Sequence, residues 1–287
     1  MPTPVTDGKH VFALFGSGIL AALDLEGKIV WREELPRLKD VDGGVCSSPI
    51  LYNDTVIIVG IAKTGLRALA KETGQVRWEQ QTRDQNRMAT PALIAVGGRT
   101  QLIHYAGGIQ ALDPATGDLL WFCRGVTSGQ SSPAFGAGLL YTDAGRGGQF
   151  CNAVDATGKG DVSKIHVKWR AKTTTAAGSS AIVVGGYVYR SCDPGLIKCR
   201  ELATGDLVYE ERTPKISPGA SPIACADGRL YFASAGKSYV IRAGPRFELL
   251  ATNDLDDGPD YTTPAVSNGR LFIKGKSYLW CIGAKTE

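Results

Sequence analysis

The seven cysteines are the first residues in this sequence that could do chemistry, as disulfides, metal ligands or nucleophiles. They are dispersed, at positions 46, 123, 151, 192, 199, 225 and 281. The C-x-x-C spacing of zinc ribbons and thioredoxin-like sites does not occur. The nearest pair, Cys192 and Cys199, flanks Asp193-Pro194-Gly195 and could face each other across a hairpin. A cross-strand disulfide would fit an exported protein, but small buried apolar residues are the favoured interpretation of both thiols.

The three histidines, His10, His104 and His166, do not form a recognisable metal site or catalytic triad. None lies in H-E-x-x-H, and no G-x-S-x-G is present to support a serine nucleophile. His104 and Tyr105 come at the end of an expected second strand, where loops gather, so His104 is a candidate ligand contact. The sequence therefore predicts no catalytic residue and no metal site, with a propeller hydrolase or lyase kept as an alternative.

Two stretches of the sequence resemble known binding motifs without meeting all of their requirements. Residues 16–21 match the dinucleotide fingerprint G-x-G-x-x-A, but that motif needs a following helix, and Gly27 arrives too soon for one. A hairpin is expected there instead. Residues 253–258 resemble a calcium loop, but Leu255 stands where a ligand is required, so the stretch is predicted to be a solvated loop.

An internal repeat must position all of these residues. A Ser/Thr-Pro step followed by a small or aliphatic residue recurs six times, and a seventh copy, Ser180-Ala181-Ile182, has lost its Pro. The six copies are Thr3-Pro4-Val5, Ser48-Pro49-Ile50, Thr90-Pro91-Ala92, Ser132-Pro133-Ala134, Ser221-Pro222-Ile223 and Thr263-Pro264-Ala265. Steps of 41 to 48 residues between copies match the length of a four-stranded propeller blade.

Each copy continues in the same order. An Asp-Gly or Asn-Gly turn such as Asp227-Gly228 suits a hairpin, because Gly accepts positive φ. A β-branched and aromatic strand and a Gly-led strand follow. In Asp113-Pro114-Ala115-Thr116-Gly117, Pro presets a type I turn and Gly takes the left-handed position. The fourth strands then end on large rings that are expected to anchor neighbouring blades: Trp31, Trp78, Trp121, Trp169 and Tyr209.

No stretch keeps helical periodicity without meeting Gly or Pro. The prediction is an all-β β-propeller of four-stranded antiparallel blades, one domain over residues 1–287, with about seven blades present. The blades are expected to start near residues 4, 49, 91, 133, 181, 222 and 264. The last copy lacks its outer strand, and only three residues precede the first anchor. The expectation is therefore an incomplete ring, either a seven-bladed arc with one open edge or an N-terminally truncated fragment of an eight-bladed ring, and the fragment is favoured.

The charge distribution and the hydropathy of the sequence argue against a nucleic-acid partner and against a transmembrane segment. The net charge is +4, and no block of like charges stands out, which argues against a nucleic-acid surface. Apolar runs are too short for a transmembrane helix, and the N-terminus has no signal peptide.

The repeated string, Ser/Thr-Pro, Asp-Gly-x-Val-Tyr, Gly-x-x-x-Ala-Leu-Asp and Thr-Gly-x-x-x-Trp, resembles the PQQ-like propeller repeat over essentially the whole chain. This family includes secreted bacterial repeat-only proteins, and its fold is shared with an outer-membrane assembly lipoprotein and with quinoprotein alcohol dehydrogenases. The resemblance implies an eight-bladed ring and a periplasmic or secreted location. Quinoprotein members hold PQQ and Ca²⁺ beneath two adjacent cysteines, and no two cysteines are adjacent here. No cofactor is therefore expected, and a PQQ-dependent dehydrogenase is kept only as an alternative.

The favoured hypothesis is a non-catalytic scaffold that binds a protein or another ligand through its loop-rich face. That face carries the fourth-to-first and second-to-third strand loops, which vary in length and chemistry, whereas the Asp-Gly and Thr-Gly turns are short and uniform. The oligomeric state and the partner's identity are open. The candidate contact residues on this face are Arg83, Asn86, Arg87, His104, Tyr105, Asp143, Arg146, Asp193 and Lys237.

Overall fold

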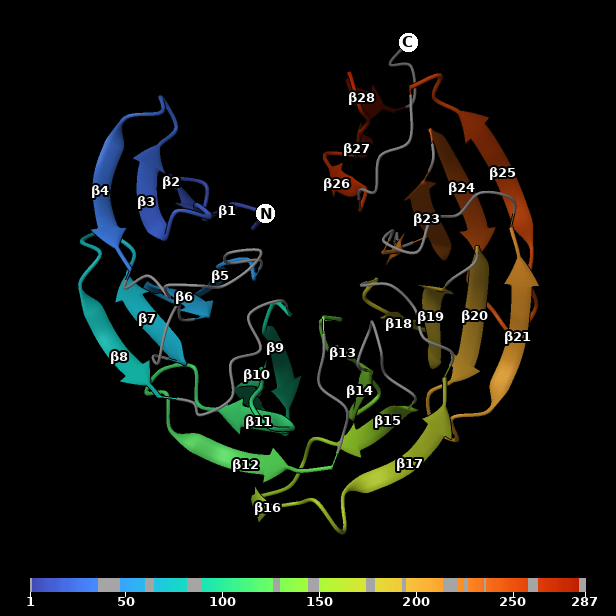
Figure 1. The fold of residues 1–287 in the computed structure, drawn as a ribbon, viewed down its shortest axis with the longest axis horizontal. Helices are drawn as coiled ribbons and strands as arrows, with labels where there is room; N and C mark the ends of the chain where they lie inside the picture. Colours follow the sequence, from blue (N-terminus) through green and yellow to red (C-terminus); the bar gives the residue numbers. More distant parts are fainter. Residues whose placement is uncertain are drawn as a thin grey trace. The chain divides into compact units, whose positions relative to one another are not determined.

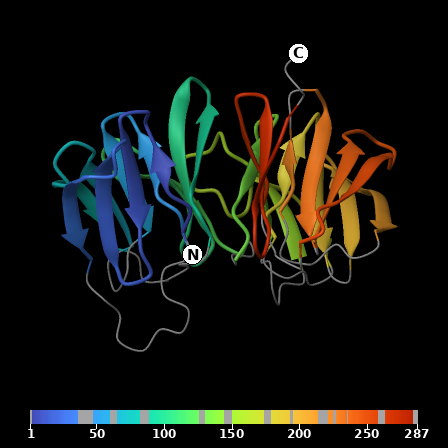
Figure 2. The same cartoon turned by 90° about the horizontal axis from the view of Figure 1, so that it is seen from above.

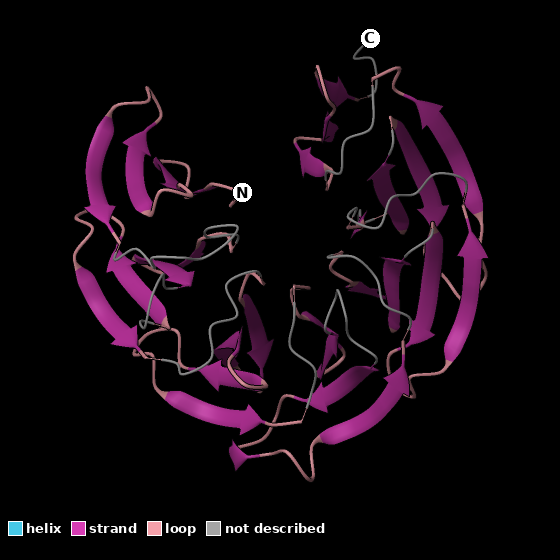
Figure 3. Ribbon diagram, in the orientation of Figure 1, coloured by secondary structure: helices cyan, strands magenta, loops and turns pink. Residues whose placement is uncertain are grey.

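The computed structural model describes residues 2–35, 47–59, 65–81, 89–125, 130–143, 150–173, 179–192, 195–213, 221–224, 227–234, 236–257 and 263–283. Within these ranges every regular element is a β-strand, and there is no helix that could cross a membrane (Figure 3). The strands form seven sheets in which neighbouring strands are antiparallel, except for one short parallel pair in the third sheet (Figure 1). The predicted all-β propeller fold is therefore confirmed.

The chain divides into two compact units, each of which is described by itself. Unit 1 comprises residues 1–133 and 157–166, and unit 2 comprises residues 134–156 and 167–287. Figure 2 shows the same strands from a second direction. That residues 1–287 form one domain stays a prediction.

Unit 1 contains three sheets. The first consists of β1 (Val5–Thr6), β2 (His10–Leu14), β3 (Ile19–Asp24) and β4 (Ile29–Glu34). The second consists of β5 (Ile50–Tyr52), β6 (Thr55–Val59), β7 (Leu66–Ala70) and β8 (Val76–Gln80). The third consists of β9 (Ala92–Val96), β10 (Arg99–Tyr105), β11 (Ile109–Leu112) and β12 (Leu119–Cys123), with a fifth strand, β16 (Gly160–Asp161), beside β12.

Unit 2 contains four sheets. The first consists of β13 (Ala134–Gly136), β14 (Leu139–Asp143), β15 (Phe150–Asp155) and β17 (Val167–Lys172), and the second of β18 (Ile182–Val184), β19 (Tyr187–Cys192), β20 (Leu196–Glu201) and β21 (Leu207–Arg212). The third consists of β22 (Ile223–Ala224), β23 (Arg229–Ser234), β24 (Lys237–Arg242) and β25 (Leu249–Asp254). The fourth consists of β26 (Ala265–Ser267), β27 (Arg270–Lys274) and β28 (Leu279–Ile282). The last sheet has three strands among the described residues. In both units each first strand begins one residue after the Pro-equivalent position of its repeat.

In β4, β8, β12, β17 and β21 the large ring lies within the fourth strand, so the prediction that these strands end on a ring is wrong. The register explains how the ring is accommodated. The ring lies opposite a small residue of the third strand, which leaves room for it. The pairs are Ala22 with Trp31, Ala68 with Trp78, Ala111 with Trp121, Ala153 with Trp169 and Cys199 with Tyr209. Cys199 thus fills an alanine position of the repeat, which agrees with its predicted role as a small buried residue.

Three of the tryptophans also tie their sheet to the next one. Trp31, Trp78 and Trp169 donate from Nε1 to the backbone carbonyls of Lys71, Pro114 and Leu202, at 2.7, 3.1 and 2.7 Å. Each acceptor lies three residues before the Gly of a Thr-Gly turn. A Cβ on that Gly would lie 2.5–2.7 Å from the indole ring, at Gly74, Gly117 and Gly205. The predicted anchoring of neighbouring blades is confirmed for these three rings.

Trp121 departs from this pattern. Its ring is fully buried, and its Nε1 donates to Oε1 of Gln101 in its own sheet at 2.8 Å. The corresponding turn glycine, Gly158, lies instead against Val162 and His166. The ring of this repeat, Trp169, comes late after the turn because extra residues follow Gly158, and these give the turn a different neighbour.

The Ser/Thr of the repeat's first step has a structural role that the sequence did not reveal. Its hydroxyl accepts a hydrogen bond from the backbone N–H of the equivalent residue in the preceding sheet. In unit 1 the bonds run from Thr3 to Ser48, from Ser48 to Thr90 and from Thr90 to Ser132, at 2.9, 3.0 and 3.1 Å. In unit 2 Ser180 donates to Ser221 at 2.8 Å. We call this series the hydroxyl ladder.

Within each unit, apolar side chains of one sheet pack against those of the next. Phe12 and Leu20 of the first sheet lie in one cluster with Ile58 of the second, and the opposite face of the second sheet packs on Leu102 of the third. In unit 2, Tyr189 packs with Phe232 of the following sheet. Burial of these faces is what stacks one sheet on the next. The expected hairpin after β2 is also confirmed, since Gly18 N–H donates to the Phe15 carbonyl at 2.8 Å.

Candidate functional site

The predicted partner face consists of the connections between second and third strands and of those that follow fourth strands. The structure describes four of its nine candidate residues. His104 and Tyr105 end β10, Asp143 ends β14, and Lys237 begins β24. The remaining five lie outside the described residues and stay predictions: Arg83, Asn86, Arg87, Arg146 and Asp193.

His104 and Tyr105 are buried rather than presented to solvent, with 3% and 2% of their surface exposed. β10 pairs with β11 up to its last residue, with Tyr105 opposite Ile109. The turn between them is tight, since Ala106 N–H donates to the Gly108 carbonyl at 3.1 Å. Both residues end a second strand, as the sequence predicts, but their side chains are buried and not exposed on the candidate face. That they contact a ligand stays a prediction.

Asp143 is buried too, in an ion pair between two sheets of unit 2. Its Oδ2 lies 2.6 Å from Nη1 of Arg190 in β19, and the side chains are 1% and 4% exposed. Burial, the largest single effect, favours the neutral form of Arg190, but the Asp143 carboxylate together with Tyr141, Cys192 and Cys151 raises the arginine pKa overall. Asp143 therefore serves packing between sheets, and its expected place in an exposed partner face is wrong.

Other polar side chains on or beside the same strands are also buried. They are Thr142, Asn152, Ser179 and Ser191, and Ser179 Oγ donates to the Ser191 carbonyl at 2.6 Å. Burial raises the pKa of Tyr141 well above its usual value, so its hydroxyl stays protonated.

Lys237 is the candidate that keeps partial exposure. Its ammonium contacts the Asp254 carboxylate at the end of β25, and this contact raises the lysine pKa. The stretch that follows differs from the predicted solvated loop, since Leu255 packs in an apolar cluster with Ile273. Asp257 accepts backbone N–H bonds from Ser277 and Tyr278, both at 3.0 Å.

The thiols resemble structural cysteines. Cys123, Cys151, Cys192 and Cys199 are free and buried, and Cys281 is free and exposed. Burial raises the pKa of Cys123 and of Cys199 to about 11, so both are protonated near neutral pH. The disulfide considered between Cys192 and Cys199 is not formed, because their strand partners are Leu196 and Tyr189.

No group of three His, Cys, Asp or Glu side chains among the described residues is placed to hold a metal ion. The expectation that the protein carries no metal, PQQ or other cofactor stays a prediction.

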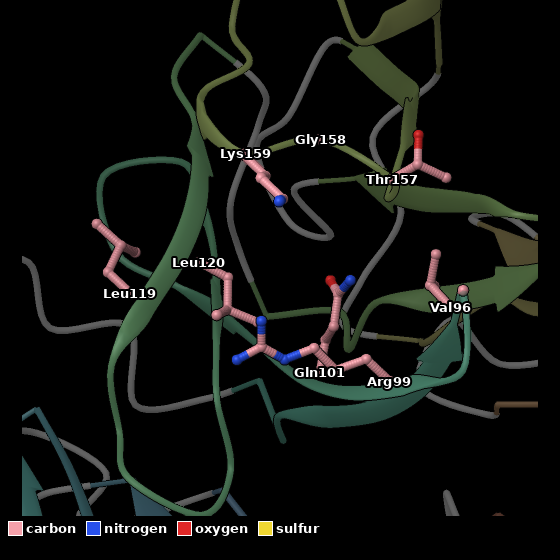
Figure 4. Close-up of a pocket in the computed structure, with 9 residues that line it drawn as sticks. Val96, Arg99, Gln101, Leu119, Leu120, Thr157, Gly158 and Lys159 are labelled. Atoms are coloured by element: carbon pink, nitrogen blue, oxygen red, sulfur yellow. The ribbon is translucent and has the colours of Figure 1, made fainter.

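Sequence reasoning passed over a cleft of about 440 Å³ in unit 1, beside the outer edge of β12 (Figure 4). Its only signal in the sequence is the long gap between the Thr157-Gly158 turn and Trp169. The residues that line the cleft are Val96, Gly97, Arg99, Gln101, Leu119, Leu120, Thr157, Gly158 and Lys159.

The stacked sheets, tryptophan anchors and repeat turns can be compared with known proteins. A family model described as "Outer membrane protein assembly factor BamB" matches residues 1–206. The chain belongs to this family. A curated relative, outer membrane protein assembly factor BamB of Yersinia pestis, is 24% identical over 94% of this chain and 70% of its own length. The predicted membership of the PQQ-like propeller repeat family is thereby confirmed.

Solved structures support the fold. BamB from Moraxella catarrhalis has a TM-score of 0.70 at 19% identity, and the match covers 93% of this chain and 80% of that one. Quinohemoprotein alcohol dehydrogenase from Comamonas testosteroni has a TM-score of 0.65 at 13% identity, covering 94% and 61%. Both likenesses are of fold and leave the chemistry of this chain to its own residues.

Proposed function

We propose that this BamB-family propeller is a non-catalytic scaffold that binds a protein partner. The observation that carries the proposal is how the chemistry-bearing residues of the candidate face are used. Asp143 is engaged by Arg190, Lys237 contacts Asp254, and the buried thiols have raised pKa values. These groups serve packing within a sheet or between sheets, so the proposed activity is recognition rather than turnover.

The partner class follows from the family. The family model and the Yersinia pestis relative are both described as an outer membrane protein assembly factor. We therefore propose a protein partner in the bacterial envelope and a periplasmic location for this chain. The loops that carry Arg83, Asn86, Arg87, Arg146 and Asp193 are the proposed contact surface, since variable loops on a rigid scaffold commonly carry recognition.

No cofactor is part of the proposal. The fold is shared with a quinohemoprotein alcohol dehydrogenase at 13% identity, and a fold hosts many functions. The adjacent cysteines that the resemblance associates with quinone binding have no counterpart in this sequence.

Affinity capture tests the proposal. The immobilised chain is incubated with detergent-solubilised envelope extract, and bound proteins are identified by mass spectrometry after cross-linking. A defined protein should be captured, and capture should fall about tenfold for Arg83→Glu combined with Arg87→Glu. The control is Arg246→Glu, an exposed arginine of the turn between β24 and β25, which should capture as the wild type does.

Two results would overturn this assignment. One is the absence of any protein that is enriched over a bead control. The other is saturable binding of PQQ with Ca²⁺, accompanied by alcohol-dependent dye reduction.

A further inference from the structure

The insertion after Gly158 is fixed to the edge of β12 by backbone bonds. β16 pairs in parallel with β12, placing Gly160 opposite Trp121 and Asp161 opposite Phe122. Val162 N–H donates to the Phe122 carbonyl at 3.0 Å, and Arg124 N–H donates to Ser163 Oγ at 2.8 Å. The outer edge of β12 therefore already accepts an extended segment over part of its length.

The cleft lies where this pairing stops. Toward the start of β12, no described strand pairs with the outer edge at Leu119 and Leu120. The segment Thr157–Lys159 diverges from that edge, and the two sides bound a cleft of about 440 Å³ with the β9–β10 hairpin (Figure 4). This volume is in the range of ligand pockets.

Two cations point toward the same space. Lys159 extends its amine into the cleft, and the Arg99 guanidinium reaches in from the β9–β10 hairpin (Figure 4). Arg99 Nη2 is bonded to Asp113 Oδ2 at 2.7 Å, so its charge is largely balanced. Within the described ranges, no carboxylate lies at ion-pair distance from Lys159.

The walls beside these cations are apolar. Leu119 is 45% exposed although it belongs to a paired strand, and Leu120 and Val96 line the cleft next to it. The cleft thus combines an open strand edge, an available ammonium group and apolar surface.

We infer that this cleft binds an extended segment of a partner protein in which acidic and aliphatic side chains alternate. Backbone groups of the segment would pair with the open edge of β12 at Leu119 and Leu120, in the manner of strand addition. An acidic side chain would reach Lys159, and an aliphatic one would cover Leu119, because neighbouring side chains of a strand point to opposite faces. This inference rests on the proposed scaffold function and names one chemistry for its partner.

The test uses synthetic peptides and the full chain. Fluorescein-labelled octapeptides of sequence TVEVEVTS and TVQVQVTS are titrated with protein, and binding is followed by fluorescence anisotropy at low and at high salt. The acidic peptide should bind saturably, about tenfold more tightly than the glutamine peptide, and should weaken as salt rises. Lys159→Glu should weaken the acidic peptide about tenfold.

Lys164→Glu is the matched control, because Lys164 is exposed on the same insertion but does not line the cleft. It should change the affinity by less than about twofold. Equal binding of the two peptides, no saturable binding of the acidic one, or equal losses from both lysine variants would overturn the inference. Thermal unfolding of each variant verifies that the fold is kept.

The capture experiment separates failure of this inference from failure of the scaffold proposal. If wild type and Lys159→Glu capture the same envelope protein equally, the scaffold proposal stands and the cleft is not its contact. If neither captures a protein, the scaffold proposal itself fails.

Discussion

The Trp78 indole donates to the Pro114 carbonyl at 3.1 Å, and the same ring covers Gly117 three residues further on. One side chain thus uses its polar edge and its apolar face to hold the next sheet. The glycine is required twice, because its φ is +79° and because a Cβ would lie 2.7 Å from Trp78 Cε3.

Gly117→Ala should therefore destabilise the fold by about 2 to 4 kcal/mol, from backbone strain and from overlap with the ring. Gly138→Ala is the control, since Gly138 has a φ of +78° with open space around its Cβ position. It should lose about 1 kcal/mol. Urea unfolding measures both, and equal losses would show that the contact with Trp78 contributes nothing.

The hydroxyl ladder gives a second prediction. Thr90→Ala removes the acceptor for the Ser48 N–H and should lower the free energy of unfolding by about 1 to 2 kcal/mol. Thr90→Ser keeps an oxygen in the same place and should recover most of this loss. If the serine variant is as unstable as the alanine variant, the methyl group of Thr90 matters and the bond does not.

The ion pair between Asp143 and Arg190 gives a third prediction. Asp143→Ala leaves a guanidinium buried without this carboxylate and should cost about 3 to 5 kcal/mol. The double variant Asp143→Ala with Arg190→Met should cost less than Asp143→Ala alone, since no buried charge is then left. Denaturant unfolding of the single and double variants decides this, and strictly additive losses would contradict it.

The pH dependence of stability should contain a contribution from Asp7. Burial alone would raise the pKa of this carboxyl, but the backbone N–H groups of His10 and Lys9 and the Lys71 amine lower it from 3.8 to about 2. Because the folded state binds the proton less tightly than the unfolded chain, the stabilisation is complete above about pH 4 and is lost as the pH falls through about 2.

Asp7→Asn should accordingly be less stable than the wild type by about 1 kcal/mol at neutral pH. The gap should close progressively below about pH 4. Urea midpoints of both proteins from pH 7 downward give the measurement. A gap that stays constant across this range would contradict the assignment to the Asp7 carboxylate.

The repeat turns and rings could be predicted because their causes are local. Gly117 needs a left-handed backbone conformation, and a large ring such as Trp78 follows turns of this kind at a recurring spacing in the sequence. The hydroxyl ladder could not, because the partner of Thr90 is a backbone N–H in another repeat that carries no sequence signal.

The positions of the candidate site residues were harder to predict than the repeat, for a related reason. His104 and Tyr105 end a strand whose pairing continues to its last residue, so a polar type did not mean an exposed position. Asp143 finds Arg190 in a sheet with which its own strand shares no ladder, and only the stacking of sheets brings them together. The cleft at Lys159 depends on where a short insertion docks, which periodicity does not encode.

The two hydrogen bonds of Ser48 bear on how a chain of such repeats can lengthen in evolution. Its N–H donates to the Thr90 hydroxyl in the following repeat, and its hydroxyl accepts from the Thr3 N–H in the preceding one. One residue therefore supplies both the donor and the acceptor that join it to its neighbours. A gene segment duplicated in register would bring a donor and an acceptor with it, and the copies on either side would need no compensating change. Evolution can therefore lengthen this architecture one unit at a time, limited by the geometry of closure and not by the chemistry of the joints.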